Sequence, residues 1–231
     1  MTQTETNPQA PSAPVSLDLY REVHKGVRRA LFGLCEAAGA LDPADSSARA
    51  AFVAQFAEID KLLTLHHGHE DGEHFGNLIA QVAPQFSAEL ESSHDKTVAD
   101  LGELRQAVIS LGSDGDADEL YDRIVAFVVD YLGHMEVEEH QVMPALSAGA
   151  TFDELLSVQI ALRTSMPPTD MVLFMRSMLP AMNPDERTSM LGGMKAGAPP
   201  EIFDIFWETA TDVLSPAQLA VVANRIGESV Q

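Results

Sequence analysis

Four long stretches with apolar residues at helical spacing fill the first two-thirds of this 231-residue chain and restrict its fold most strongly. In each stretch the apolar side chains recur every three or four residues, which places them on one face of an α-helix. Short breaks such as LDPADS and GSDGDAD separate the stretches. We expect helices over residues 17–41, 47–83, 85–111 and 118–148. Ser16 is expected to cap the first helix, and Pro144 to kink the last or end it early.

Long amphipathic helices joined by short loops pack as antiparallel neighbours. The predicted fold class is therefore all-α, with an up-down antiparallel four-helix bundle over residues 16–149. Shorter helical runs, each bounded by Pro, Gly or a capping residue, predict a smaller C-terminal set of short helices over residues 150–231. We expect these helices to pack on the bundle or on a second subunit, as in a homodimer. A methionine-rich binding surface between Met166 and Met194 is the alternative.

Composition excludes several classes of partner. The formal net charge of −21 disfavours nucleic acid and anionic membrane surfaces, both of which attract Lys and Arg clusters. No apolar run approaches the roughly 20 residues that a membrane-spanning helix needs. Cys35 is the only cysteine, so no intrachain disulfide forms, which suits a reducing compartment. Residues 1–15 are polar, lack the features of a signal peptide and predict a disordered tail. We therefore expect a soluble cytoplasmic protein.

All the histidines lie in the region of the predicted bundle, and each predicted helix carries at least one. They are His24, His66, His67, His69, His74, His94, His134 and His140. Side chains from facing helices can converge on one point in the interior of a bundle. The histidines are therefore candidates for a shared site.

Two sequence pairs place an imidazole and a carboxylate one helical turn apart. His66 precedes Glu70 by four residues, and His134 precedes Glu138 by four. Residues at this spacing lie on one face of a helix. His24 and His94 stand among the apolar residues of the other two helices, which predicts that they face the core. The combined set is His24, His66, Glu70, His94, His134 and Glu138.

The choice among neighbouring histidines leaves alternatives. His67 is rotated about 100° from His66, so the two rings cannot face one ion. We expect His67, like His74 and His140, to lie outside the ligand set, either orienting a ligand or facing solvent. His69 with Glu73 forms a rival pair that a different helix register would favour.

Asp130, one turn before His134, is a further candidate to orient a ligand imidazole.

Four imidazoles and two carboxylates suit two metal ions. This donor set fits iron, zinc, manganese or nickel better than calcium or magnesium, which prefer oxygen ligands. A structural zinc site needs only four ligands and commonly uses cysteine. No arrangement typical of a nucleophilic hydrolase and no phosphate-binding loop stands out in the chain.

The segments around these residues resemble a known family. His24, HHGHED at residues 66–71, His94 and HMEVEE at residues 134–139 are together similar to the hemerythrin-like HHE cation-binding domains, over about residues 17–148. The resemblance implies a non-haem centre of two iron ions with an oxo or hydroxo bridge; zinc and manganese are the alternatives. It implies six ligands, with Glu70 and Glu138 as bridges: His24, His66, Glu70, His94, His134 and Glu138.

One departure from the family bears on function. Oxygen-carrying members have a second histidine one turn after the histidine of the third helix, and here that position is Val98. The difference argues against plain reversible O2 carriage and favours redox reactivity or sensing. The expected function is to bind or sense O2 or a related small oxidant. The alternatives are an oxidoreductase acting on peroxide or nitric oxide, and an iron- or oxygen-responsive interaction module. Whether the protein is an enzyme stays open.

Overall fold

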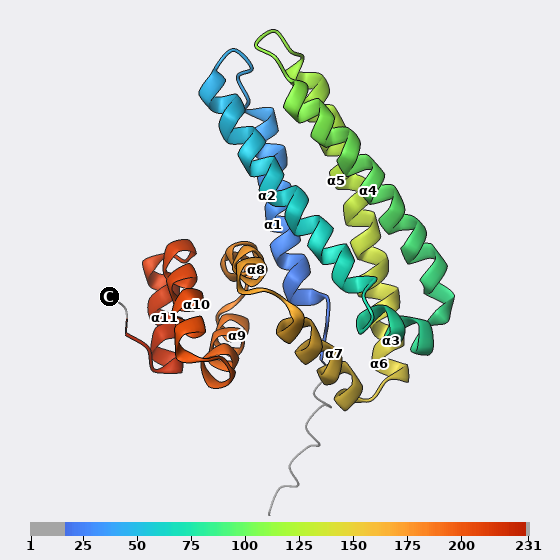
Figure 1. The fold of residues 1–231 in the computed structure, drawn as a ribbon, viewed down its shortest axis with the longest axis vertical. Coiled ribbons are helices and arrows are strands. Elements are labelled where there is room, and N and C mark those ends of the chain that lie inside the picture. Colours follow the sequence, from blue (N-terminus) through green and yellow to red (C-terminus); the bar gives the residue numbers. More distant parts are fainter. Residues whose placement is uncertain (1–16, 230–231) are drawn as a thin grey trace, which may run out of the picture.

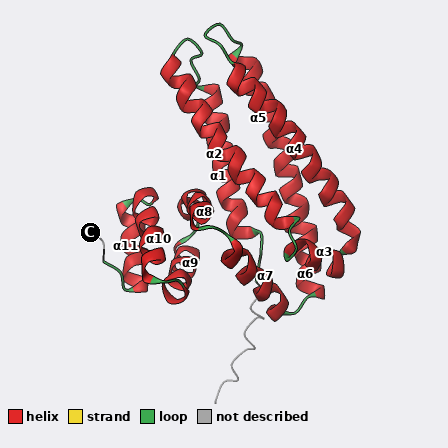
Figure 2. Cartoon of the chain, viewed as in Figure 1, coloured by secondary structure: helices red, strands yellow, loops and turns green. Residues whose placement is uncertain are grey.

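The computed structural model describes residues 17–229, and over that range it contains helices joined by turns and loops (Figure 2). The four long helices lie side by side (Figure 1): α1 (Arg21–Gly39), α2 (Ser46–Glu70), α4 (Ser87–Ser110) and α5 (Ala117–Val137). The α1–α2 and α4–α5 connections lie at the same end, so sequential long helices run in opposite directions. The predicted all-α class and four-helix bundle are confirmed. Within the described residues, no helix has the length and apolar character that crossing a membrane requires.

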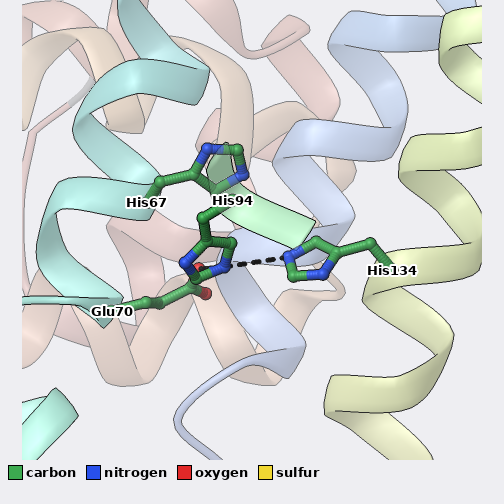
Figure 3. A group of neighbouring side chains, drawn as sticks. All are labelled: His67, Glu70, His94 and His134. Atoms are coloured by element: carbon green, nitrogen blue, oxygen red, sulfur yellow. Dashed lines mark hydrogen bonds and ion pairs between the residues drawn. The ribbon is translucent and has the colours of Figure 1, made fainter. Parts of the chain in front are cut away.

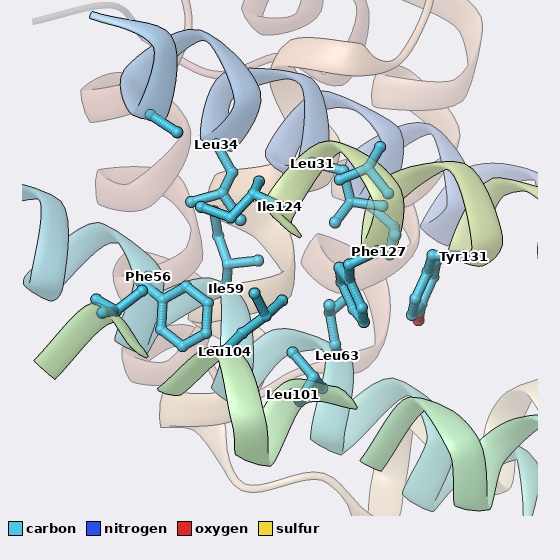
Figure 4. Packing of buried hydrophobic residues seen from close by; sticks show 14 of the residues in the cluster. Leu31, Leu34, Phe56, Ile59, Leu63, Leu101, Leu104, Ile124, Phe127 and Tyr131 are labelled. Atoms are coloured by element: carbon cyan, nitrogen blue, oxygen red, sulfur yellow. The ribbon is translucent and has the colours of Figure 1, made fainter. Parts of the chain in front are cut away.

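The apolar faces of the long helices meet in one core toward the end of the bundle that carries these two connections (Figure 4). Each helix contributes large side chains that are almost completely buried: Leu31 and Leu34 from α1, Phe56, Ile59 and Leu63 from α2, Leu101 and Leu104 from α4, and Ile124, Phe127 and Tyr131 from α5. Burying side chains of this size provides most of the free energy that holds such helices together. The core fixes the register of the helices and therefore the positions of the polar residues beyond it.

The predicted single helix over residues 47–83 is wrong, because the chain turns after Glu70. Helix α2 ends there, residues 71–74 form a turn, and α3 (Phe75–Val82) follows. A side chain at Gly76 would lie 2.9 Å from the backbone oxygen of Asp71, so this close turn favours glycine. The turn buries Phe75 and brings Asp71 onto His94 in α4.

The other long helices begin close to the predicted positions. Asp18 opens α1, since its carboxylate accepts hydrogen bonds from the backbone N–H groups of Tyr20 and Arg21. The predicted cap, Ser16, and the predicted tail lie outside the described residues. A short 3-10 turn, η1 (Pro84–Phe86), leads directly into α4.

Pro144 does not end the last helix of the bundle. A π-helical turn, η2 (Glu138–Val142), follows α5, and α6 (Met143–Gly149) continues without a break. Pro144 follows this π turn, and the wider turn accommodates the lack of an N–H group on proline. The wider π turn begins at Glu138, and turns of this kind often occur at functional sites.

The C-terminal segment forms five helices of similar length: α7 (Phe152–Ser165), α8 (Pro168–Ala181), α9 (Pro184–Gly197), α10 (Pro200–Val213) and α11 (Pro216–Ile226). The last four each begin with a proline, and these prolines are spaced 16 residues apart. Proline suits the first turn because its φ angle is preset for a helix. Helix α8 packs on α10, and α9 packs on α11. The regular spacing indicates a repeated helix-turn unit.

Helix α8 connects this C-terminal set to the bundle by packing closely on α1. The Ser177 hydroxyl donates a hydrogen bond of 2.6 Å to the backbone oxygen of Gly26 in α1. Lys25 forms an ion pair with Glu186 of α9 across the same boundary. The expectation that these helices pack on the bundle is confirmed, and methionines such as Met175 are part of their core.

Candidate metal centre

Six predicted site residues come together inside the bundle. His24 lies on α1, His66 and Glu70 on the last turns of α2, His94 on α4, His134 near the end of α5, and Glu138 at the start of the π turn. All six are buried, and the exposed fraction of each is below a tenth. The apolar core occupies one part of the bundle interior, and this polar cluster lies beyond it toward α3 and α6.

The first group joins α1 and α2 to the π turn. It contains His24, His66, Glu70 and Glu138, each with one nitrogen or oxygen within 4.8 Å of the others. The Nε2 atom of His66 lies 3.2 Å from Oε1 of Glu70. The Nε2 atom of His24 lies 3.3 Å from Oε2 of Glu138 and 3.9 Å from Oε1 of Glu70. Two imidazoles and two carboxylates thus point at one small volume.

The second group joins α2, α4 and α5 (Figure 3). It contains His67, Glu70, His94 and His134, again with one donor atom of each within 4.8 Å of the others. The Nε2 atoms of His94 and His134 are 3.1 Å apart, and Nε2 of His94 lies 3.4 Å from Oε2 of Glu70. Glu138 also reaches this side, since its Oε1 atom lies 3.2 Å from Nε2 of His134.

His67 corrects the sequence analysis. We expected it to lie outside the ligand set, but its side chain is buried and belongs to the second group. As expected from their rotation about the helix axis, His66 and His67 do not face the same point. His66 faces the first group, and His67 faces the second. The Tyr131 hydroxyl lies 2.9 Å from Nε2 of His67, and the ring of His67 stacks on that of His94.

Val98, the position of the histidine that oxygen carriers have, is more than half exposed on α4. The fifth imidazole near the two groups is that of His67 on α2. In the sequence, the adjacent histidines His66 and His67, together with the lack of a histidine at position 98, were the signal for the role of His67.

Oxygen atoms orient three of the imidazoles by contacting the nitrogen that faces away from the cluster. The Nδ1 atom of His24 lies 2.7 Å from Glu139, and that of His94 lies 2.6 Å from Asp71. The Nδ1 atom of His134 lies 3.1 Å from the Ser93 hydroxyl. Such contacts fix the ring and leave Nε2 as the inward donor.

Asp130, which we expected in this orienting role, instead pairs with Lys96 at the surface, 2.8 Å away.

The remaining histidines lie outside both groups. His69 is half-buried against the ring of Phe174, and its rival partner Glu73 is exposed. His74 is exposed, and His140 forms a surface pair with Glu136. The register that the sequence analysis chose for the pairs on α2 and α5 therefore agrees with the geometry.

Burial and mutual proximity perturb the acidity of the two central carboxyl groups in opposite directions. Burial, reinforced by the nearby Glu138 carboxylate, raises the pKa of Glu70 to about 8. Burial also acts to raise the pKa of Glu138, but the adjacent imidazoles of His134, His24 and His94 hold it well below its usual range. Two carboxylates this close cannot both carry charge easily without a nearby cation.

Burial also shifts the pKa values of the imidazoles on α2. Burial and the neighbouring rings of His94 and His134 lower the pKa of His67 to about 3, which keeps it neutral. Burial likewise holds the pKa of His66 well below its usual range. A neutral imidazole has a lone pair available to a metal ion.

The donor atoms of the cluster fit a bound cation. Buried polar atoms in proteins almost always have a partner. Within the described residues, Nε2 of His24 and His66 and both side-chain oxygens of Glu70 and Glu138 are buried without a hydrogen-bond partner. Metal coordination would satisfy these atoms, and the mixture of imidazole and carboxylate suits a transition metal rather than calcium or magnesium.

Comparison with protein families gives one match. A family model described as the hemerythrin HHE cation binding domain matches residues 15–146, more than half of the chain. Comparison with curated proteins and with solved structures gave no match. The matched range contains every residue of the two groups.

Proposed function

Because the chain belongs to the hemerythrin HHE cation-binding family, we propose that its two groups of imidazoles and carboxylates hold two metal ions. His24 and His66 would bind one ion, and His67, His94 and His134 the other. Glu70 and Glu138 would bridge the two. This assignment keeps the six ligands expected from the sequence and adds His67.

The single observation that carries the proposal is the position of the two carboxylates between the groups. Glu70 directs Oε1 toward His66 and Oε2 toward His94. Glu138 directs Oε2 toward His24 and Oε1 toward His134. Each carboxylate therefore offers one oxygen to each side, which is the arrangement that a bridging ligand requires.

We propose iron as the metal, with zinc and manganese as alternatives. The five imidazoles and two carboxylates include no cysteine, and such a set suits non-haem iron. Two iron ions would supply redox chemistry toward O2, peroxide or nitric oxide. The chain would exclude bulk water by burying every donor. It would also hold the His24 and His94 rings in place through Glu139 and Asp71.

The function that this site supports best is binding or sensing of O2 or a related small oxidant. The second candidate is an oxidoreductase acting on peroxide or nitric oxide. One observation favours it: the phenol of Tyr131 is buried against the second group, in contact with His67. A phenol O–H so placed could supply a proton and an electron to a reaction at the centre.

The proposal is tested first by metal analysis and an absorption spectrum of protein purified without added metal. Two irons per chain are expected, with spectral changes on exposure to O2 for the first function and turnover of peroxide or nitric oxide for the second. One zinc per chain, or no metal after anaerobic loading with Fe(II), would refute the two-iron centre.

The bridging role is tested by Glu70→Ala and Glu138→Ala. Each variant should lose at least one metal ion per chain, because each removes an oxygen from both sides of the centre. Glu136→Ala is the matched control, since that side chain lies near the end of α5 but is exposed. Two metals retained in either bridge variant would contradict the assignment.

We also propose a cytoplasmic location and a homodimer formed through the C-terminal helices. Ile205 on α10 and Val221 on α11 expose apolar surface that such a contact would cover. Sedimentation of wild type and of Ile205→Asp distinguishes a dimer through this face from a monomer.

A further inference from the structure

A cavity of about 120 Å³ lies between the bundle and the C-terminal helices, and its inner wall is the candidate metal centre. His66 and Glu70 form that wall. O2, peroxide or nitric oxide would leave most of it empty. The space is therefore larger than the small oxidants need.

The side walls of the cavity are apolar and come largely from the part of the chain beyond the family match. Val23 and Phe75 line it from the bundle. Met171, Phe174 and Met178 of α8 line it from the other side, together with Met190 of α9. Methionine side chains are flexible and polarisable, so they adapt to apolar ligands of irregular shape. Without α8 and α9 this face of the centre would have no such wall.

The charges around the cavity select against anions. Asp18 and Glu22 line the cavity, and Arg163 is the one lysine or arginine side chain among its described lining residues. Asp18 is already engaged by backbone N–H groups at the start of α1. In the metal-free protein, a carboxylate or phosphate ligand would therefore meet more negative than positive charge here, and a neutral ligand would not be repelled.

Size indicates the class of ligand. A 150 Å³ apolar cavity engineered in another protein accepts benzene. The cavity here is partly open to solvent, so its volume sets the part of a ligand that it can bury, which corresponds to one six-membered carbon ring or a short hydrocarbon chain. We propose that the C-terminal helices form a binding site for a neutral, apolar organic molecule of about this size, held against His66 and Glu70. The proposal deepens the proposed function and rests on it for the metal that would lie beside the ligand.

Methionine methyl groups provide the test, since four methionines line the cavity: Met166, Met171, Met178 and Met190. The full-length protein, labelled with ¹³C at its methionine methyls and assigned by single Met→Leu variants, is titrated with toluene. Saturable shifts are expected for these four signals and not for Met135 or Met143, which lie in the bundle core. In metal-free protein, benzoate, which is similar in shape but anionic, is expected to cause no saturable shift.

A pair of tryptophan variants separates filling of the cavity from damage to the fold. Met166→Trp fills the cavity from the α7–α8 turn and should weaken toluene binding by at least roughly tenfold, or about 1.4 kcal/mol. Ile160→Trp adds the same side chain to an exposed position of α7 outside the lining and should leave the affinity unchanged. The proposal is overturned by non-saturable or indiscriminate shifts, by benzoate binding to metal-free protein as tightly as toluene, or by equal affinities in the two variants.

Repeating the titration on metal-free and on iron-loaded protein separates the two proposals. Toluene that shifts the four methyls in a protein unable to take up metal would support the pocket and refute the metal centre. Two irons per chain without toluene binding would do the opposite. In iron-loaded protein, faster relaxation of the toluene protons than in zinc-loaded protein is expected if the ligand lies beside the centre; equal relaxation would contradict that position.

Discussion

At the scale of single residues, the position of His67 changes the composition of the centre. Replacing His67 with Ala should lower the metal content from two ions to one per chain, because the second group loses one of its three imidazoles. Metal analysis after anaerobic loading measures this directly. His69→Ala is the matched control, since His69 lies two residues away on α2 but packs against Phe174 outside both groups.

Two ions retained in the His67→Ala variant would mean that the imidazole only supports the Tyr131 hydroxyl. Equal losses in the His67→Ala and His69→Ala variants would point to damage at the end of α2 instead.

The sequence was sufficient to identify the candidate site residues that lie one helical turn apart and those that stand among apolar residues. His66 with Glu70 and His134 with Glu138 follow from helical periodicity alone, and His24 and His94 follow from their apolar neighbours. The role of His67 depends on where a second ion would lie relative to α2, which is a property of the packed bundle. The same applies to Asp71, because its contact with His94 depends on how α2 and α4 pack.

At the scale of helices, the contact between α1 and α8 depends on a glycine. A methyl group at Gly26 would lie 2.8 Å from the side chain of Met178 and 3.0 Å from its backbone. Gly26→Ala should therefore lower the free energy of unfolding by roughly 1–3 kcal/mol, the usual cost of overpacking, despite the better helix propensity of alanine. Urea unfolding and hydrogen exchange of α8 measure the effect.

Gly33→Ala on the same helix is the control for that prediction. The nearest atom to an added methyl group there is a side-chain nitrogen of Gln55 at 3.8 Å, an ordinary contact. This variant should gain about 0.5–1 kcal/mol from helix propensity. If the two variants were equally stable, the close approach of α8 to α1 would be wrong.

Helix boundaries show where local patterns stop being sufficient. The run from Ser47 to Ala83 has helical spacing throughout, yet the chain turns at residues 71–74, buries Phe75 and brings Gly76 close to the backbone of Asp71. Apolar periodicity does not show such contacts. Pro144 shows the opposite case: an early end of the helix was one expectation, but the helix continues to Gly149. The missing N–H of Pro144 is accommodated because a π turn precedes it. The 16-residue spacing of Pro168, Pro184 and the prolines that follow is visible in the sequence and predicts the C-terminal helices well.

At the scale of the whole molecule, the centre couples metal binding to stability. Glu70 and Glu138 are buried with no hydrogen-bond partner for their oxygens, on a chain whose net charge is already −21. A ligand that binds the folded state alone stabilises it by about 2.7 kcal/mol at a hundred times its dissociation constant. For a chain of this length, that corresponds to a rise in Tm of roughly 5–11 °C.

Stripping the protein with a chelator should therefore lower Tm by about this amount, and reloading with Fe(II) under anaerobic conditions should restore it. Glu138→Ala should recover less of the loss than wild type, because both sides of the centre lose an oxygen. His140→Ala, an exposed change outside both groups, should recover fully. Full recovery in the Glu138→Ala variant would mean that iron stabilises the fold without this carboxylate. The same Tm before and after stripping would mean that the buried carboxylates are stable without metal, and the reason for expecting an ion between them would be lost.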